Sequence, residues 1–137
     1  MTLTGIRQEM IDGKPSITEC LHMADEWIKS NKDLTLDSES NPINFIFLTC
    51  GDWDLKTMLP SQCKFFNIKY PNYFTTWINI KKSFAELTGH FPKGMPTMLQ
   101  MLNLNLEGRH HSGIDDCRNI AKIAKEMAQR GFIFEKT

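Results

Sequence analysis

One stretch decides the fold: Asn44-Phe45-Ile46-Phe47-Leu48-Thr49. This short, continuous apolar run is typical of a strand buried on both faces of a sheet. The following Gly51-Asp52 predicts a turn, and residues 53–59 are predicted to form a helix with Asp52 as its N-cap. Pro60 is expected to break or kink that helix.

Further elements are predicted on both sides of this strand. Apolar residues recur at helical spacing after Pro15 and Ser16, where a helix can begin, whereas residues 32–41 are polar and predict a surface loop. A second strand is predicted over residues 73–80, and helices over 81–87 and 95–104. In the last helix, which ends at Gly131, one face carries Asp116, Ile120, Ile123, Ala124 and Met127.

The order of strand, helix, strand and helix predicts an α/β fold with a parallel sheet. Two strands are few for five helices, because a parallel pair is normally covered on both faces and joined to further strands. We therefore expect residues 1–137 to form a single partial domain whose opening β-strands are missing.

Composition limits the classes of function. The 137 residues are 41% hydrophobic, which is enough for one globular core. Sixteen basic and sixteen acidic side chains cancel, so a nucleic acid would have to be held by a local basic patch. The longest apolar run, residues 45–50, is too short to span a membrane. Four cysteines without close spacing, and no secretory segment, indicate an intracellular protein, cytoplasmic or nuclear.

Two aspartates and a histidine form the candidate site. Asp54 follows the carboxyl end of the first strand, where open α/β sheets bind ligands. Asp116 lies in the first turn of the last helix, on its apolar face, so its carboxylate needs a partner or a cation. His111, in the loop over residues 108–113, suits a general base near neutral pH. Pairs of Mg²⁺ ions bound by such acids cleave phosphodiesters, so the pattern predicts metal-assisted hydrolysis.

Less specific interpretations of the same residues stay open. An acidic residue in a first helical turn is more often a cap than a ligand, and we favour the cap for Asp115. Trp53 and Trp77 are favoured as core aromatics, although Trp53 is close enough to Asp54 to keep stacking on a base open.

Several segments resemble a known family, the Eri-type exoribonucleases, which are 3′-to-5′ RNA exonucleases of the DEDDh superfamily. The resemblance spans nearly the whole chain and is closest to the branch of the prion-protein-interacting exoribonuclease. It rests on Gly51-Asp52-Trp53-Asp54-Leu55, Trp77-Ile78-Asn79-Ile80-Lys81-Lys82 and Gly108-Arg109-His110-His111-Ser112-Gly113-Ile114-Asp115-Asp116-Cys117-Arg118-Asn119-Ile120-Ala121, with Leu3-Thr4-Gly5-Ile6 matching a further motif.

This resemblance implies a ribonuclease H-like exonuclease fold. It also implies two-metal hydrolysis of single-stranded RNA from its 3′ end, with Mg²⁺ or Mn²⁺, releasing 5′ nucleotides. The implied site residues are Asp54 and Asp116 as metal ligands, His111 as general base, and Leu3, Thr4 and Ile6 beside the pocket for the terminal nucleotide, with Trp53 as a further substrate-binding candidate.

Two features depart from the family pattern. His110 stands where the family usually has proline, and the spacing to Asp116 favours His111 as the base. The family's first motif, Asp-x-Glu on the opening strand, is absent from the predicted strands. Asp37-Ser38-Glu39 fits the pattern but lies in a polar loop. Since such sites rely on several oxygen ligands, we expect this chain alone to bind Mg²⁺ weakly and to show little nuclease activity.

The alternative function is a catalytically degenerate module that binds RNA or protein. Without an opening strand, the edge of the strand over residues 45–50 would be exposed. An exposed edge accepts a strand from a partner or from a second copy of the chain.

Overall fold

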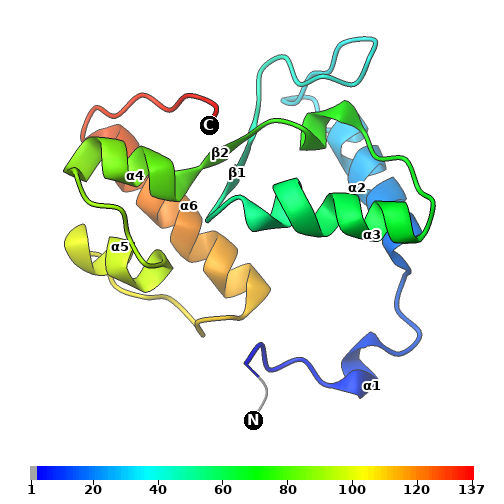
Figure 1. Ribbon diagram of the computed structural model, residues 1–137, viewed down its shortest axis with the longest axis horizontal. Coiled ribbons are helices and arrows are strands. Elements are labelled where there is room, and N and C mark those ends of the chain that lie inside the picture. The colour runs from blue at the N-terminus through cyan, green and yellow to red at the C-terminus, as the bar shows by residue number, and fades with distance from the viewer. Residues whose placement is uncertain (1–2) are drawn as a thin grey trace.

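The computed structural model describes residues 3–137. A parallel two-stranded sheet lies between two groups of helices (Figure 1). In this sheet β1 (Phe47–Thr49) pairs with β2 (Trp77–Asn79), so that Phe47 lies opposite Trp77 and Thr49 opposite Asn79. The predicted parallel α/β arrangement is therefore present. No helix within the described residues is long and apolar enough to cross a membrane.

On one side of the sheet lie α1 (Gln8–Ile11), α2 (Ile17–Ser30) and α3 (Leu59–Phe65) (Figure 1). The predicted start of α2 is confirmed, because the Ser16 hydroxyl accepts the N–H of Glu19 at 3.3 Å. The buried Tyr73 donates its hydroxyl to Asp25 of α2 at 2.9 Å. Burial of the ring, followed by this hydrogen bond, raises the pKa of Tyr73. The bond joins α2 to the segment before β2.

On the other side, α4 (Ile80–Thr88), α5 (Met95–Met101) and α6 (Gly113–Gln129) enclose the main hydrophobic core. The helix α4 ends at Gly89, whose φ of 77° is the left-handed conformation that glycine adopts at helix ends. The buried side chains of this core are Ile80, Phe84, Met95, Met98, Leu99, Leu102, Ile123 and Met127.

Both strands differ from their predictions. The predicted strand over residues 73–80 has only three residues, since 72–74 form the 3₁₀-helix η2 (Asn72–Phe74) and Ile80 begins α4. The expectation that the first strand is buried on both faces is wrong, because every residue of β1 is half-buried. Within residues 3–137, β2 is the only ladder partner of β1, which leaves the outer edge of β1 open. The other edge of β2 is covered by Thr137, which donates its N–H to Trp77 O at 3.0 Å.

The helix after β1 also departs from its prediction. It begins as a π-helix, η1 (Asp54–Met58), in which Leu59 N–H donates to Asp54 O five residues earlier, and continues into α3. Pro60, which lacks an N–H, lies in the first turn of α3 and does not break the helix, because the wider π turn precedes it. Asp52 is not the N-cap; the helix has no side-chain cap there.

Candidate active site

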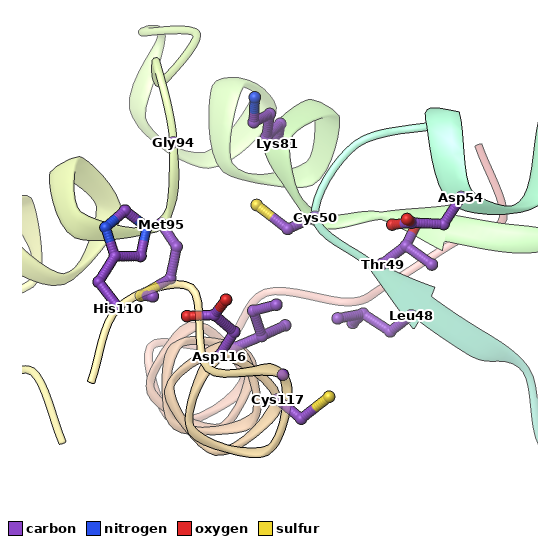
Figure 2. A pocket seen from close by; sticks show the side chains of 12 residues that line it. Leu48, Thr49, Cys50, Asp54, Lys81, Gly94, Met95, His110, Asp116 and Cys117 are labelled. Carbon is purple, nitrogen blue, oxygen red and sulfur yellow. The ribbon is translucent and has the colours of Figure 1, made fainter. Parts of the chain in front are cut away.

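A cavity of about 520 Å³ opens beside the carboxyl end of β1 and the first turn of α6 (Figure 2). Open α/β sheets place ligands at this position. The titratable groups that line the cavity are two carboxylates, two thiols, an ammonium and an imidazole. They belong to Asp54, Asp116, Cys50, Cys117, Lys81 and His110.

Asp54 is the first residue of the π-helix η1. Its side chain is exposed to solvent and lines the cavity. Among residues 3–137 its carboxylate accepts no hydrogen bond and joins no ion pair. Single π turns inside helices occur frequently at functional sites. The carboxylate is therefore available to bind a cation.

Asp116 lies on the wall formed by α6, whereas Asp54 lies beside β1 (Figure 2). The Asp116 side chain is half-buried, and its Oδ1 accepts the N–H of His111 at 3.1 Å. No ion pair to Asp116 exists in the described part of the chain. Its place in the first turn of α6 is favourable for a negative charge, because the helix dipole is positive there.

The two histidines occupy different places. His110 is half-buried and lines the cavity (Figure 2). His111 is exposed and is not among the lining residues. The two rings stack with centroids 3.7 Å apart and planes 25° apart. His111 has a φ of 70°, a conformation that non-glycine residues adopt rarely. The structure thus places His110 in the same cavity lining as Asp54 and Asp116, and links the main chain of His111 to Asp116.

The predicted substrate-binding residues lie outside the cavity lining. Leu3, Thr4 and Ile6 are exposed, and the carbonyl of Leu3 accepts a hydrogen bond from Arg109 Nη2 at 3.5 Å. This contact places the amino-terminal segment against the loop that precedes α6. Trp53 is 63% exposed, so its interpretation as a core aromatic is wrong. Trp53 directly precedes Asp54 in the sequence, and its exposed ring is accessible to a ligand.

Asn79 connects the end of β1 with the start of α4. It is buried, and its Oδ1 accepts the N–H of Gly51 at 3.1 Å and that of Lys81 at 3.0 Å. Its Nδ2 donates to Asp52 Oδ1 at 3.2 Å. One amide side chain therefore fixes the turn before Asp54 and caps the helix that carries Lys81.

Asp52 holds the same turn from the other side. Its carboxylate accepts the indole N–H of Trp77 at 2.9 Å and pairs with Lys82 at 3.1 Å. The hydrogen bond from Trp77, followed by Lys82 and then Asn79, holds the pKa of Asp52 below its usual range. These contacts use Asp52 to attach the turn to β2 and α4, which is why it does not cap the following helix.

We predict that replacement of Asp52 by asparagine makes stability less dependent on pH. A carboxyl whose folded-state pKa is lowered stabilises the fold above its unfolded pKa of about 3.9, and that contribution is lost as pH falls through the folded value. The free energy of unfolding should differ between the wild type and Asp52→Asn by about 1 kcal/mol at pH 6, and this difference should shrink towards pH 3. Urea denaturation across this range measures it.

Asp33→Asn is the matched control, because the exposed Asp33 side chain makes no hydrogen bond or ion pair within residues 3–137. Its difference from the wild type should stay near zero. A difference for Asp52→Asn that is constant from pH 6 to pH 3 would contradict the prediction.

Asn119 and Asp115 fix the loop before α6. Asn119 is fully buried; its Oδ1 accepts Glu107 N–H at 2.8 Å, and its Nδ2 donates to the carbonyls of Glu107 at 2.8 Å and of Asp115 at 2.9 Å. The Asp115 carboxylate accepts Arg109 N–H at 3.0 Å. This bond is the main cause that lowers the pKa of Asp115. Asp115 therefore satisfies an N–H group of the loop, and the half-buried carboxylate is not the exposed helix cap that we favoured.

Gly108 in the same loop has a requirement that only glycine meets. Its φ is 65°, in the left-handed region, and a Cβ atom at this position would overlap the Asp115 carboxylate. The loop can therefore pack against Asp115 only because this residue has no side chain.

The pKa of the Cys50 thiol is shifted by burial and by the charges around the cavity. Burial raises the pKa of its thiol, and the negative charges of Asp54 and Asp116 raise it further, while Lys81 acts in the opposite direction. The fields of two carboxylates and one ammonium therefore meet at Cys50. The thiol itself stays protonated at neutral pH and is not an activated nucleophile.

The sequence held signals for the residues that were missed. Asn79 is a polar residue at the end of an apolar strand and directly before a helix, where a cap is expected. Asn119 shares a helical face with Ile123 and Met127, and a polar residue on a buried face needs hydrogen-bond partners. Lys81 lies in the motif that begins at Trp77, but its place in the same cavity as Asp116 depends on how α4 and α6 pack.

The fold and the cavity agree with a comparison to protein families. A family model described as RNase_T, exonuclease, matches residues 1–124. This match includes Asp54, His111 and Asp116. The chain belongs to the exonuclease family.

Relatives within this family are exoribonucleases. ERI1 exoribonuclease 3 from Homo sapiens is 49% identical over 136 residues, which are 98% of this chain and 39% of that relative. The 3′-5′ exoribonuclease 1 from Rattus norvegicus is 38% identical over 132 residues, 94% of this chain and 36% of the relative. The resemblance to the Eri-type exoribonucleases is confirmed. The chain spans well under half the length of these relatives.

Solved structures confirm the fold class. The nuclease domain of 3′hExo, a DEDDh family member bound to rAMP, matches with a TM-score of 0.84 and 32% identity, covering 98% of this chain and 66% of that chain. Cell-death related nuclease 4 matches with a TM-score of 0.85 and 26% identity, covering 98% and 45%. The α/β exonuclease fold predicted from the sequence is therefore correct.

Proposed function

We propose that this chain forms part of a 3′-to-5′ exoribonuclease and supplies two metal ligands and the general base for hydrolysis of RNA phosphodiesters. One observation carries the proposal: Asp54 and Asp116 line the same cavity at the carboxyl end of β1, and no cationic side chain of residues 3–137 neutralises either carboxylate. Two unneutralised carboxylates in one cavity repel each other, and a bound cation removes that cost.

The donor atoms fit a hard divalent cation. Carboxylate oxygens of Asp54 and Asp116 are the ligands that Mg²⁺ and Mn²⁺ prefer. When bound, such a cation polarises the phosphodiester and lowers the pKa of a bound water. Residues 3–137 contain no group of three or more His, Cys, Asp or Glu side chains placed to hold one metal ion. Because such sites rely on several oxygen ligands, we propose that the chain alone binds the metal ion weakly and has little activity.

His111 is the proposed general base. Its main chain is tied to Asp116 at 3.1 Å, so its imidazole is attached next to a metal ligand. An exposed imidazole on a short loop can turn about its side-chain bonds and take the proton of an attacking water at neutral pH. His110 is the second imidazole at this site, and its place in the cavity makes it the comparison residue in any test of His111.

The proposed substrate is the 3′ end of single-stranded RNA. Related solved structures include 3′hExo bound to rAMP and a 3′-exonuclease that recognises the 3′ end of a histone mRNA stem-loop. In this chain the exposed Trp53 ring is available to stack on a base, and Leu3, Thr4 and Ile6 lie in the segment that contacts the loop before α6. We propose these four residues as contacts of the terminal nucleotide.

A titration with Mn²⁺ tests the metal ligands. We expect binding in the millimolar range, followed by paramagnetic broadening of backbone amide signals of the full chain, and at least a tenfold loss of affinity in Asp54→Asn and in Asp116→Asn. Asp33→Asn is the control and should bind Mn²⁺ as the wild type does. Equal affinities in all four proteins would contradict the proposed site.

Shortening of an RNA oligonucleotide labelled at its 5′ end tests the reaction. The chain alone should shorten the RNA slowly from the 3′ end in Mn²⁺, and Asp116→Asn and His111→Ala should remove this activity. Rapid degradation by the pure chain, lost in Asp116→Asn, would show that the expectation of weak activity is wrong. Cleavage that survives in both variants would contradict the assigned roles.

The open edge of β1 favours a second candidate function, a module that binds a partner strand or a second copy of this chain. Within residues 3–137 this edge has no ladder partner, and an apolar pocket of about 180 Å³ lies beside β1, with Trp27, Phe45 and Phe47 in its lining. Light scattering measures the mass in solution. A monomer that unfolds cooperatively would contradict this candidate.

A further inference from the structure

The cavity contains a cation that the proposed function has not used. Lys81, from the first turn of α4, is the only lysine or arginine among the residues that the structure places in the cavity lining. An RNA strand carries one negative charge per phosphate and would enter a cavity that already holds the carboxylates of Asp54 and Asp116. A positive side chain at this place offsets the repulsion.

Lys81 is held in place at both ends. Its backbone N–H is bonded to Asn79 Oδ1 at 3.0 Å, which fixes the start of its helix. Its ammonium donates one hydrogen bond, to the carbonyl of Lys93 at 3.1 Å. Figure 2 shows Lys81 on the α4 wall of the cavity, with Asp116 on the α6 wall.

The Lys81 ammonium has N–H donors that no acceptor within residues 3–137 uses. An ammonium has three N–H donors, and among residues 3–137 that of Lys81 makes no second hydrogen bond and no ion pair. The next residue is different: Lys82 is paired with Asp52 at 3.1 Å. Of these two adjacent lysines, only Lys81 lines the cavity, and it has donors to offer to an anion.

The charge of Lys81 also acts inside the cavity. It opposes the effect of Asp54 and Asp116 on the pKa of Cys50, so all three charges act on one atom between the walls. The ammonium is therefore placed to interact with a group that binds between the two carboxylates.

We propose that Lys81 binds a phosphate group of the RNA strand at the rim of the cavity, through non-bridging phosphate oxygens. In this role it positions the strand so that the phosphodiester to be cleaved lies between Asp54 and Asp116. The inference rests on the proposed function and adds a phosphate-binding residue to it.

Adenosine 5′-monophosphate and adenosine are the probes, because they differ only in the phosphate. In a titration of the full chain with Mg²⁺ present, followed by backbone amide shifts, Lys81→Met should weaken binding of the monophosphate roughly tenfold and leave binding of adenosine unchanged. Lys81→Arg keeps the charge and should retain most of the affinity. Lys125→Met is the control, since Lys125 is exposed on α6 and lies outside the cavity lining.

Three outcomes would overturn the inference: unchanged binding of the monophosphate in Lys81→Met, an equal loss for monophosphate and adenosine, or no preference of the wild type for the monophosphate. The Mn²⁺ titration of the Asp54 and Asp116 variants separates this failure from failure of the proposed function. If those variants lose Mn²⁺ while Lys81→Met behaves as wild type, only the role of Lys81 is wrong.

Discussion

Replacement of Asn119 by alanine is expected to lower the free energy of unfolding by about 3 kcal/mol. The buried side chain makes three hydrogen bonds to backbone groups, two to Glu107 and one to Asp115. Alanine would leave the N–H and the carbonyl of Glu107 without these partners and would open a gap where the fully buried amide lies. The loss should be concentrated in the loop that carries His111 and in the first turn of α6.

Urea denaturation measures the loss, and hydrogen exchange at the amide of Glu107 locates it. Asn105→Ala is the matched control, because the exposed Asn105 side chain makes no hydrogen bond within residues 3–137. Its stability should change by less than about 0.5 kcal/mol. Slow exchange at Glu107 in Asn119→Ala would show that this side chain does not hold the loop.

Replacement of Phe84 by alanine should have the largest effect on stability, about 3–5 kcal/mol. Phe84 is 0% exposed and lies in the core enclosed by α4, α5 and α6. Removal of its ring leaves a cavity and loses the burial of a large apolar group. Because small domains are stable by only about 5–15 kcal/mol, this variant should be close to unfolded at 37 °C.

Phe91→Ala makes the same chemical change at a side chain that is 64% exposed, and should cost less than about 1 kcal/mol. Comparison of the two urea midpoints, with circular dichroism as the signal, tests the prediction. Similar midpoints would mean that the core enclosed by α4, α5 and α6 does not dominate stability.

The sequence predicted the elements whose apolar spacing is long and regular. The helices α2 and α6 follow from such spacing, and the parallel pairing of the strands follows from the order of strand, helix, strand and helix. The strand over residues 73–80 was predicted too long because aromatic residues suit both strands and buried turns. Tyr73 is buried in a 3₁₀ turn by its bond to Asp25, a contact between residues 48 positions apart that no local pattern contains.

The candidate site could be predicted in its residues but not in its arrangement. Spacing in the sequence favours His111 as the base, while the structure places the ring of His110 in the cavity. His111 has a φ of 70°, a conformation that non-glycine residues adopt rarely and that spacing along the sequence does not predict. The roles of Asp54, Asp116 and His111, and the extent of the domain, stay predictions that the experiments above address.

The π turn of η1 sets the direction in which the Asp54 carboxylate points. Leu59 and Cys63 are buried and fix α3, while Asp54 lies one wide turn before it, where Leu59 N–H reaches back five residues to Asp54 O. A π turn holds one residue more than an α turn. If the turn were wound as a regular α turn with all its residues kept, Leu59 N–H would reach back four residues instead of five, and Asp54 would rotate by about 100° around the helix axis. The geometry of the ligand is thus encoded in the helical register, and a change from the π to the α form would remove it without altering any side chain of the cavity.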